Sequence, residues 1–131
     1  MANELTIGKQ NMVSLISDHP LGDLLKPLKT EILLFDSYIA GTTHIEDESI
    51  LDHLKEGDVL ALKREPDNRF DDNSIMILDS QNRKLGYIPE KDNTVFARLM
   101  DAGKYLIAKV KYVEPKGSFR FIRINIYLVD F

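Results

Sequence analysis

The segment best suited to bind a ligand runs from Arg64 to Ile75 and combines carboxylates, amides and one aromatic ring. Most of its residues are turn formers, whose side chains hydrogen-bond their own backbone, so a turn between two strands explains their presence. Phe70 is the exception, because it places a large apolar ring among polar residues and directly beside Asp71. Two interpretations follow: the ring folds back onto the core, or it stays exposed and contacts a ligand.

No catalytic signature accompanies this segment. The sequence contains neither Gly-x-x-x-x-Gly-Lys-Ser/Thr nor Gly-x-Gly-x-x-Gly, Gly-x-Ser-x-Gly or His-Glu-x-x-His. His19, His44 and His53 have no second histidine three or four residues away, and there is no cysteine, which argues against a metal site. Adjacent carboxylates at 47–48 and 71–72 have no defined partner for acid–base chemistry. We therefore expect a protein that is not an enzyme and that needs no metal or cofactor.

Composition and charge narrow the class of protein further. The chain has 131 residues, of which 44% are hydrophobic and 29% charged, as in an ordinary folded domain. It lacks a leader peptide and any run of about 18 apolar residues, so we expect a cytoplasmic protein without a membrane span. The net charge of −4 argues against a protein that coats nucleic acid nonspecifically. Lys104 to Arg123 nevertheless contains six basic residues and one acid, and is either a solvated strand face or a phosphate-binding patch.

Hydrophobic periodicity divides the chain near residue 30. Apolar residues between positions 9 and 28 recur with helical spacing, interrupted by Pro20 and Pro27, which predicts a helical N-terminal extension over residues 1–30. The remainder, residues 31–131, has mainly the alternation typical of strands. We expect strands over residues 31–40, 58–64, 74–78, 84–88, 106–113 and 119–129, and a loop with one helical turn over 45–54.

One helix is predicted between the fourth and fifth strands. Asp92 or Asn93 would cap its start and Gly103 would end it. Its apolar face would comprise Val95, Phe96, Leu99 and Met100.

The last two strands indicate curvature. In the first of them, Lys109 and Lys111 should lie on one face, with Ala108, Val110 and Tyr112 on the other. In the second, the apolar positions change from odd to even numbers, which predicts a β-bulge near residues 121–122. Six short strands, one helix and a bulge predict a mainly β (α+β) fold, a small OB-like or SH3-like barrel that is partly closed.

Four segments in this order resemble the HIRAN domain family: Ala40-Gly41-Thr42, then Arg64-Glu65-Pro66-Asp67-Asn68-x-Phe70-Asp71-x-Asn73-Ser74-Ile75, then Leu85-Gly86-Tyr87-Ile88-Pro89, then Ala97 to Gly103. The resemblance covers about residues 31 to 131. It implies an OB-like barrel that binds single-stranded DNA and captures its free 3′ end.

The resemblance also implies roles for single residues. Asp71 would accept a hydrogen bond from a terminal 3′-hydroxyl and would repel a phosphate in the same place. Phe70 would stack on a base, and Asn68 would hydrogen-bond a base edge. Tyr87 would contact the terminal phosphate or sugar.

Three further residues complete the implied site. Lys91 and Lys116 would contact phosphates. Many family members carry a pair of aromatic residues after the glycine of the first segment, whereas this chain has Thr43, His44 and Ile45 there. His44 would therefore supply the stacking surface on that side.

Two functions remain open at this point. The first is a non-catalytic module for single-stranded DNA or DNA 3′ ends, in DNA repair or replication-fork processing, with a helicase or nuclease acting in trans as a partner. The second is a protein-interaction adaptor that keeps the barrel but has lost DNA binding. The net acidity and the altered segment from Gly41 to Ile45 favour the second.

Overall fold

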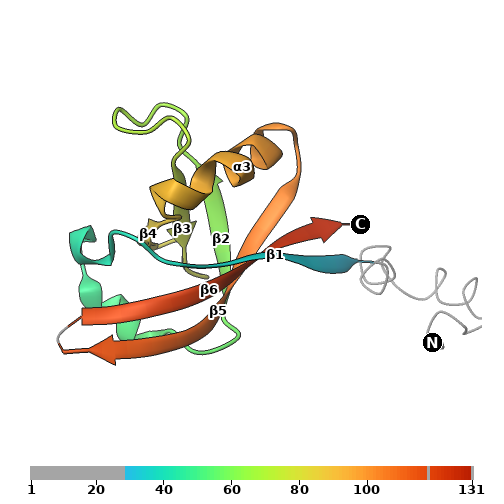
Figure 1. The fold of residues 1–131 in the computed structure, drawn as a ribbon. Coiled ribbons are helices and arrows are strands. Elements are labelled where there is room, and N and C mark those ends of the chain that lie inside the picture. Colours follow the sequence, from blue (N-terminus) through green and yellow to red (C-terminus); the bar gives the residue numbers. More distant parts are fainter. Residues whose placement is uncertain (1–28, 118, 131) are drawn as a thin grey trace, which may run out of the picture. The chain divides into compact units, whose positions relative to one another are not determined.

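The computed structural model describes residues 29–117 and 119–130, in which six strands form one antiparallel sheet (Figure 1). Residues 32–129 form one compact unit. The helices expected between residues 9 and 28 lie outside the described residues. In chain order the elements are β1 (Thr30–Tyr38), η3 (Thr42–His44), η4 (Glu48–His53), β2 (Val59–Arg64), β3 (Ile75–Leu78), β4 (Lys84–Tyr87), α3 (Glu90–Asp101), β5 (Tyr105–Lys116) and β6 (Phe119–Asp130).

The sheet curls until its two edges meet, which confirms the partly closed, OB-like barrel. Its strand order is β1-β6-β5-β2-β3-β4, and one bridge between Ala40 and Tyr87 joins the chain after β1 to the β4 edge. The two residues exchange backbone hydrogen bonds of 2.8 and 2.9 Å. Gly86 permits this contact, because a Cβ atom there would collide with the Ala40 carbonyl oxygen. The Leu-Gly-Tyr segment therefore has a structural role, because it allows the two edges of the sheet to meet.

The core fills the inside of the curled sheet. Its fully buried side chains come from most strands and include Leu60, Ile75, Ile77, Leu85, Leu106, Ile122, Ile124 and Ile126. The even-numbered isoleucines of β6 all point inward, as strand alternation requires. Truncation of one such side chain to alanine typically costs about 2–5 kcal/mol. This core is what holds the loops between strands in place.

The β-bulge is in β5 and not in β6, so its predicted position was wrong. Val110 pairs with Ile124 and Tyr112 pairs with Arg123, which leaves Lys111 as the extra residue. Because of this insertion Tyr112 is exposed, contrary to the prediction that it faces the core. Phe121 needs no bulge, since its ring lies outside the core, 5.2 Å from the Tyr38 ring.

Helix α3 begins earlier than the sequence suggested. It follows Pro89, and neither Asp92 nor Asn93 caps it. The Asp92 carboxylate instead accepts a hydrogen bond of 3.0 Å from the Ser37 hydroxyl, and Asn93 is buried. Val95, expected on the apolar face, is 63% exposed.

The end of α3 agrees with the prediction. Gly103 adopts a φ of 93° and its N–H donates to the Met100 carbonyl, while the N–H of Lys104 donates to Leu99. This pair of hydrogen bonds is a common helix terminator that favours glycine.

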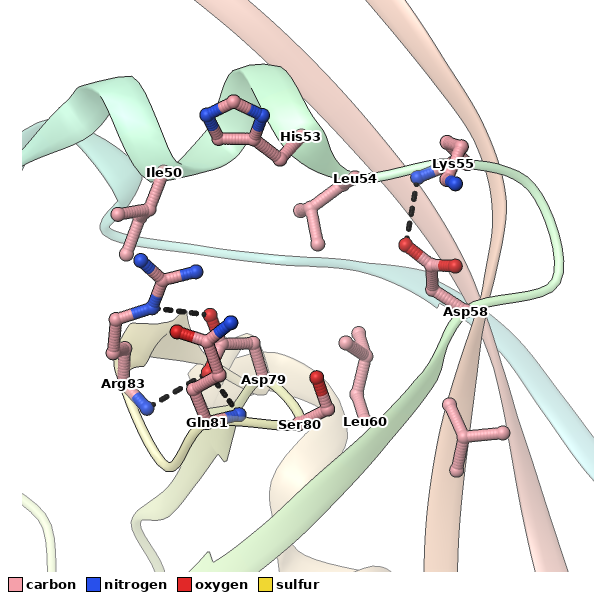
Figure 2. Close-up of a pocket in the computed structure, with 11 residues that line it drawn as sticks. Ile50, His53, Leu54, Lys55, Asp58, Leu60, Asp79, Ser80, Gln81 and Arg83 are labelled. Atoms are coloured by element: carbon pink, nitrogen blue, oxygen red, sulfur yellow. Dashed lines mark hydrogen bonds and ion pairs between the residues drawn. The ribbon is translucent and has the colours of Figure 1, made fainter.

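The turn between β3 and β4 is built around Asp79. Its carboxylate accepts hydrogen bonds of 2.9 Å from the N–H groups of Gln81 and Arg83 and of 2.8 Å from the Arg83 side chain (Figure 2). Burial opposes ionisation, but these hydrogen bonds lower the pKa of Asp79. A cavity of about 380 Å³ lies beside the turn, toward His53 and Asp58. The turn thereby fixes the Arg83 side chain at this end of the barrel.

Among the described residues, no helix is long and apolar enough to cross a membrane.

Candidate functional site

The loop between β2 and β3 is shaped by Asn68. Its side-chain oxygen accepts hydrogen bonds from the N–H of Phe70 at 2.9 Å and of Asp71 at 3.2 Å. Its side-chain nitrogen donates to Glu65 at 3.2 Å. Both ends of the amide are thus used inside the loop, and the resulting turn sets the positions of Phe70 and Asp71.

Phe70 is the most exposed large apolar side chain among the described residues, with 94% of its surface accessible. The structure therefore rejects the interpretation in which this ring folds back onto the core. An accessible aromatic ring on a turn held by Asn68 provides a flat apolar surface for a ligand.

The Asp71 carboxylate is oriented by a donor on each oxygen. Oδ1 accepts a hydrogen bond of 2.9 Å from the N–H of Asn73, and Oδ2 accepts one of 2.8 Å from the side-chain nitrogen of Asn93. Asn93 belongs to α3 and is only 2% exposed, so its position is fixed by packing. Each carboxylate oxygen can accept a further hydrogen bond from a ligand.

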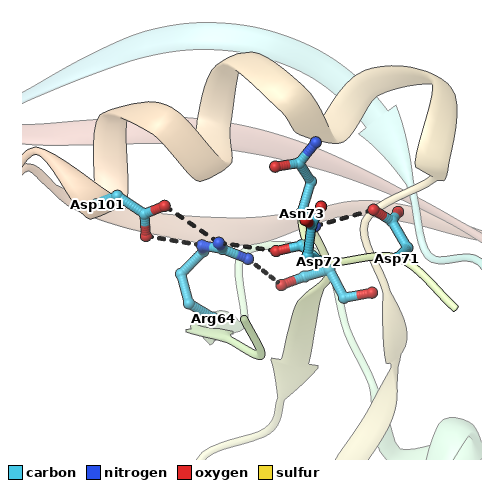
Figure 3. Close-up of polar contacts among 6 residues, drawn as sticks. Arg64, Asp71, Asp72, Asn73 and Asp101 are labelled. Atoms are coloured by element: carbon cyan, nitrogen blue, oxygen red, sulfur yellow. Dashed lines mark hydrogen bonds and ion pairs between the residues drawn. The ribbon is translucent and has the colours of Figure 1, made fainter. Parts of the chain in front are cut away.

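The Arg64 side chain acts as a clamp between the β2–β3 loop and the end of α3 (Figure 3). Its guanidinium donates to both carboxylate oxygens of Asp101, at 2.9 and 3.1 Å, and to the carbonyl oxygens of Asp72 and Ser74, at 2.9 and 2.8 Å. The hydrogen bond from Arg64 lowers the pKa of Asp101. Since Asp101 is the last residue of α3, this side chain connects the loop to the helix that carries Asn93.

These residues surround an open groove of about 550 Å³. Five of the seven predicted site residues line it, and the remaining lining comes from the residues around Gly41, Ser74, Ile88 and Glu90; the five are His44, Asn68, Phe70, Asp71 and Tyr87. The bridge between Ala40 and Tyr87 forms part of the wall. Segments distant in sequence therefore meet where the barrel closes.

The Tyr87 hydroxyl has an internal partner. It donates a 2.8 Å hydrogen bond to Glu65 Oε1, the same oxygen that accepts from Asn68. Glu65 and Asn93 are polar residues of the site that the sequence analysis did not select. The family-like segment contained Glu65, whereas the only sequence signal for Asn93 was a helix-cap preference.

The two predicted lysines lie elsewhere. Lys91 stands 5.5 Å from the Tyr38 ring centre and Lys116 stands 5.0 Å from the Phe121 ring centre. Neither lines the groove, and within the described part of the chain no other lysine or arginine does so. Nor do residues 29–117 and 119–130 contain a group of three or more side chains that could hold a metal ion.

A search of curated proteins found no significant match. A crystal structure of a protein from Lactobacillus plantarum is 27% identical, with a TM-score of 0.72 over 79% of this chain and 99% of that one. The crystal structure of the HIRAN domain of human HLTF is 15% identical, with a TM-score of 0.61 over 76% of this chain and 78% of that one. This likeness to the human domain shows a shared fold.

The family model agrees with the motifs and the fold. It is the model of the HIRAN domain, and it matches residues 32–129, which include β2 to β5, nearly all of β1 and β6, and the whole groove described above. On that match the chain belongs to the HIRAN domain family.

Proposed function

We propose that this protein is a non-catalytic module that binds the free 3′ end of single-stranded DNA in the groove between Phe70, Asp71 and His44. The setting would be DNA repair or replication-fork processing, with a helicase or nuclease acting in trans. The observation that carries the proposal is the pairing of a fully exposed ring with a fixed carboxylate on one turn.

Phe70 supplies the affinity in this proposal. A nucleobase stacked on an aromatic side chain contributes roughly 1–3 kcal/mol, and stacking tolerates any base. The ring is already exposed in the unbound protein, so binding would bury it without rearranging the turn. A ligand without a flat π surface would gain much less from this ring.

Asp71 supplies the selectivity. Its carboxylate can accept a hydrogen bond from a terminal hydroxyl, because each oxygen has so far only one donor. An internal nucleotide or a 3′-phosphate would place a second anion against it. Two unit charges about 4 Å apart repel by roughly 1 kcal/mol in water and about 4 kcal/mol at the effective dielectric constant of a protein surface.

His44 lines the groove from a different segment of the chain, after β1. It follows Gly41, whose φ of 74° turns the chain away from β1 into η3. An imidazole ring can stack on a base or donate to a phosphate. In this arrangement His44 and Phe70 would face the terminal nucleotide from two different loops.

A second candidate function has one observation in its favour. The groove is lined by Asp71 and Glu90 and by no lysine or arginine among the described residues. A protein partner carrying a cation and an aromatic side chain would suit such a groove. Under this alternative the protein would be an adaptor without measurable DNA binding at low salt.

Fluorescence anisotropy with the Asp71→Asn variant tests the proposal. We expect the wild-type protein to prefer a 3′-hydroxyl over a 3′-phosphate oligonucleotide, and the variant to lose that preference because the charge is gone. Asp72→Asn is the matched control, since it removes a charge from the adjacent, exposed residue. An unchanged preference in Asp71→Asn would refute the role of this carboxylate, and a stable protein partner without any DNA binding would favour the adaptor.

A further inference from the structure

The groove lacks the positive charge that a nucleic acid strand requires. Asp71 and Glu90 line it, and in the described part of the chain no lysine or arginine does. Affinity for nucleic acids comes largely from cations that neutralise phosphates. If the groove holds the terminal nucleotide, the phosphates that precede it must meet cations outside the groove.

A second hollow begins at the His44 side of the groove. Its volume is about 550 Å³, and its lining combines His44 and Ile50 with two acids, Glu46 and Asp47, and two bases, Arg83 and Lys84. His44 lines both hollows, so they adjoin at this side chain. A strand that leaves the groove past His44 would enter this second hollow.

Lys84 lies at the border between the two hollows. Its ammonium group is 4.5 Å from the centre of the Tyr87 ring, and Tyr87 lines the groove. Arg83, the preceding residue, is held by its Nε atom, which donates to Asp79 at 2.8 Å (Figure 2). Both cations thus have defined positions on the β3–β4 hairpin.

The acids of this hollow are not equivalent. The Asp47 carboxylate caps η4, accepting hydrogen bonds from the N–H and the hydroxyl of Ser49 at 3.0 and 2.6 Å. Its two oxygen atoms are therefore not equally free, since Oδ1 is held by Ser49. Glu46 is exposed and remains an opposing charge that a bound phosphate would meet beside Lys84.

We propose that nucleotides on the 5′ side of the terminal one leave the groove past His44, and that Lys84, assisted by Arg83, binds their phosphates. The inference rests on the proposed function and adds to it the direction in which the strand leaves the groove. The other basic side chains have different surroundings. Lys116 lies over Phe121. Arg69 lines a hollow of residues 64–70 that shares Asn68 and Phe70 with the groove, so Arg69 marks the other exit against which the exit past His44 is tested.

The test measures affinity against salt concentration for three charge-removal variants of the full chain: Lys84→Gln, Arg69→Gln and Lys116→Gln. The ligands are a dinucleotide and a single-stranded DNA of about ten nucleotides, both with a 3′-hydroxyl. We expect Lys84→Gln to weaken binding of the longer ligand several-fold and to reduce the slope of log affinity against log salt by about 0.7, the value for one phosphate contact on a single strand. Dinucleotide binding should change less.

Controls separate the strand path from folding and from the proposed function itself. Lys84→Arg should restore both affinity and slope, because it keeps the charge over Tyr87. A loss of slope in Arg69→Gln or Lys116→Gln, with none in Lys84→Gln, would overturn the inference and place the strand on another face. That result would leave end recognition standing, whereas failure of the wild-type protein to bind either ligand would instead refute the proposed function.

Discussion

A carboxyl group in place of the Asn93 amide should make the free energy of unfolding depend on pH. The Asn93 side-chain nitrogen donates to Asp71 Oδ2 at 2.8 Å and is buried. In Asn93→Asp, two carboxyl groups face each other at that distance and cannot both be ionised without repulsion. At 2.8 Å this repulsion is about 1.5 kcal/mol with the dielectric constant of water and about 6 kcal/mol with a value near 20. One proton should therefore stay on the pair above the usual pH range of carboxyl groups.

The sign of the effect follows from linkage. The introduced carboxyl group would have a higher pKa in the folded protein than in the unfolded chain. The variant therefore loses stability as the pH rises from about 4 through the folded pKa. The repulsion above corresponds to a pKa increase of about 1–4, since each pKa step is worth about 1.4 kcal/mol. We expect a lower free energy of unfolding at about pH 8 than at about pH 5.

Urea unfolding at the two pH values, with Asn73→Asp as the control, measures this directly. The Asn73 side chain points to the Thr94 hydroxyl, at 3.5 Å, while its backbone N–H contacts Asp71, so the same substitution there should add little pH dependence. Equal pH dependence in the two variants would refute the reasoning, because it would mean that Asn93 does not hold Asp71 in solution.

Three further predictions concern the ring, the clamp and the closure of the barrel. Phe70→Ala should weaken DNA binding by roughly 1–3 kcal/mol without lowering the melting temperature, because the ring is 94% exposed; a large drop in melting temperature would show that the ring packs in solution. Arg64→Met should destabilise the loop and raise its hydrogen exchange, and the wild-type contact should weaken as the pH falls through the lowered pKa of Asp101; unchanged exchange in the variant would contradict the clamp. Gly86→Ala should prevent stable folding or open the bridge to Ala40, as circular dichroism and melting would detect; a variant with wild-type stability would show that position 86 has room for a side chain beside the Ala40 carbonyl group.

The fold was largely accessible from the sequence, because local patterns specify most of it. Strand alternation and glycine at position 103 located the strands and the end of the helix. The bulge was misplaced because the change of apolar positions was explained by an inserted residue in β6, whereas the Phe121 ring lies outside the core and contacts Tyr38 and Arg123. When the apolar residues of a strand change from odd to even positions, the apolar side of that strand has changed. This change does not show which of two paired strands contains an extra residue.

The site was accessible only in part. Residues within one loop, such as Phe70 and Asp71, stood out by their types and by the family resemblance. Asn93 did not, because its side chain reaches Asp71 from a separate element, the helix. Lys84 did not, because its role depends on the second hollow, which residues 44–50 form together with the β3–β4 hairpin. The basic cluster from Lys104 to Arg123 drew attention away from the β3–β4 hairpin, and nothing in the sequence indicated that Lys84 would lie near the groove.

The most direct test of the central claim compares two ligands that differ in one group. Fluorescence anisotropy would measure binding of the full chain to the same short single-stranded DNA with a 3′-hydroxyl or a 3′-phosphate, at low and near-physiological salt. End recognition through Asp71 predicts tighter binding of the hydroxyl form, by roughly 1–4 kcal/mol before screening by salt. Equal affinity for the two forms, or no binding to either, would contradict it.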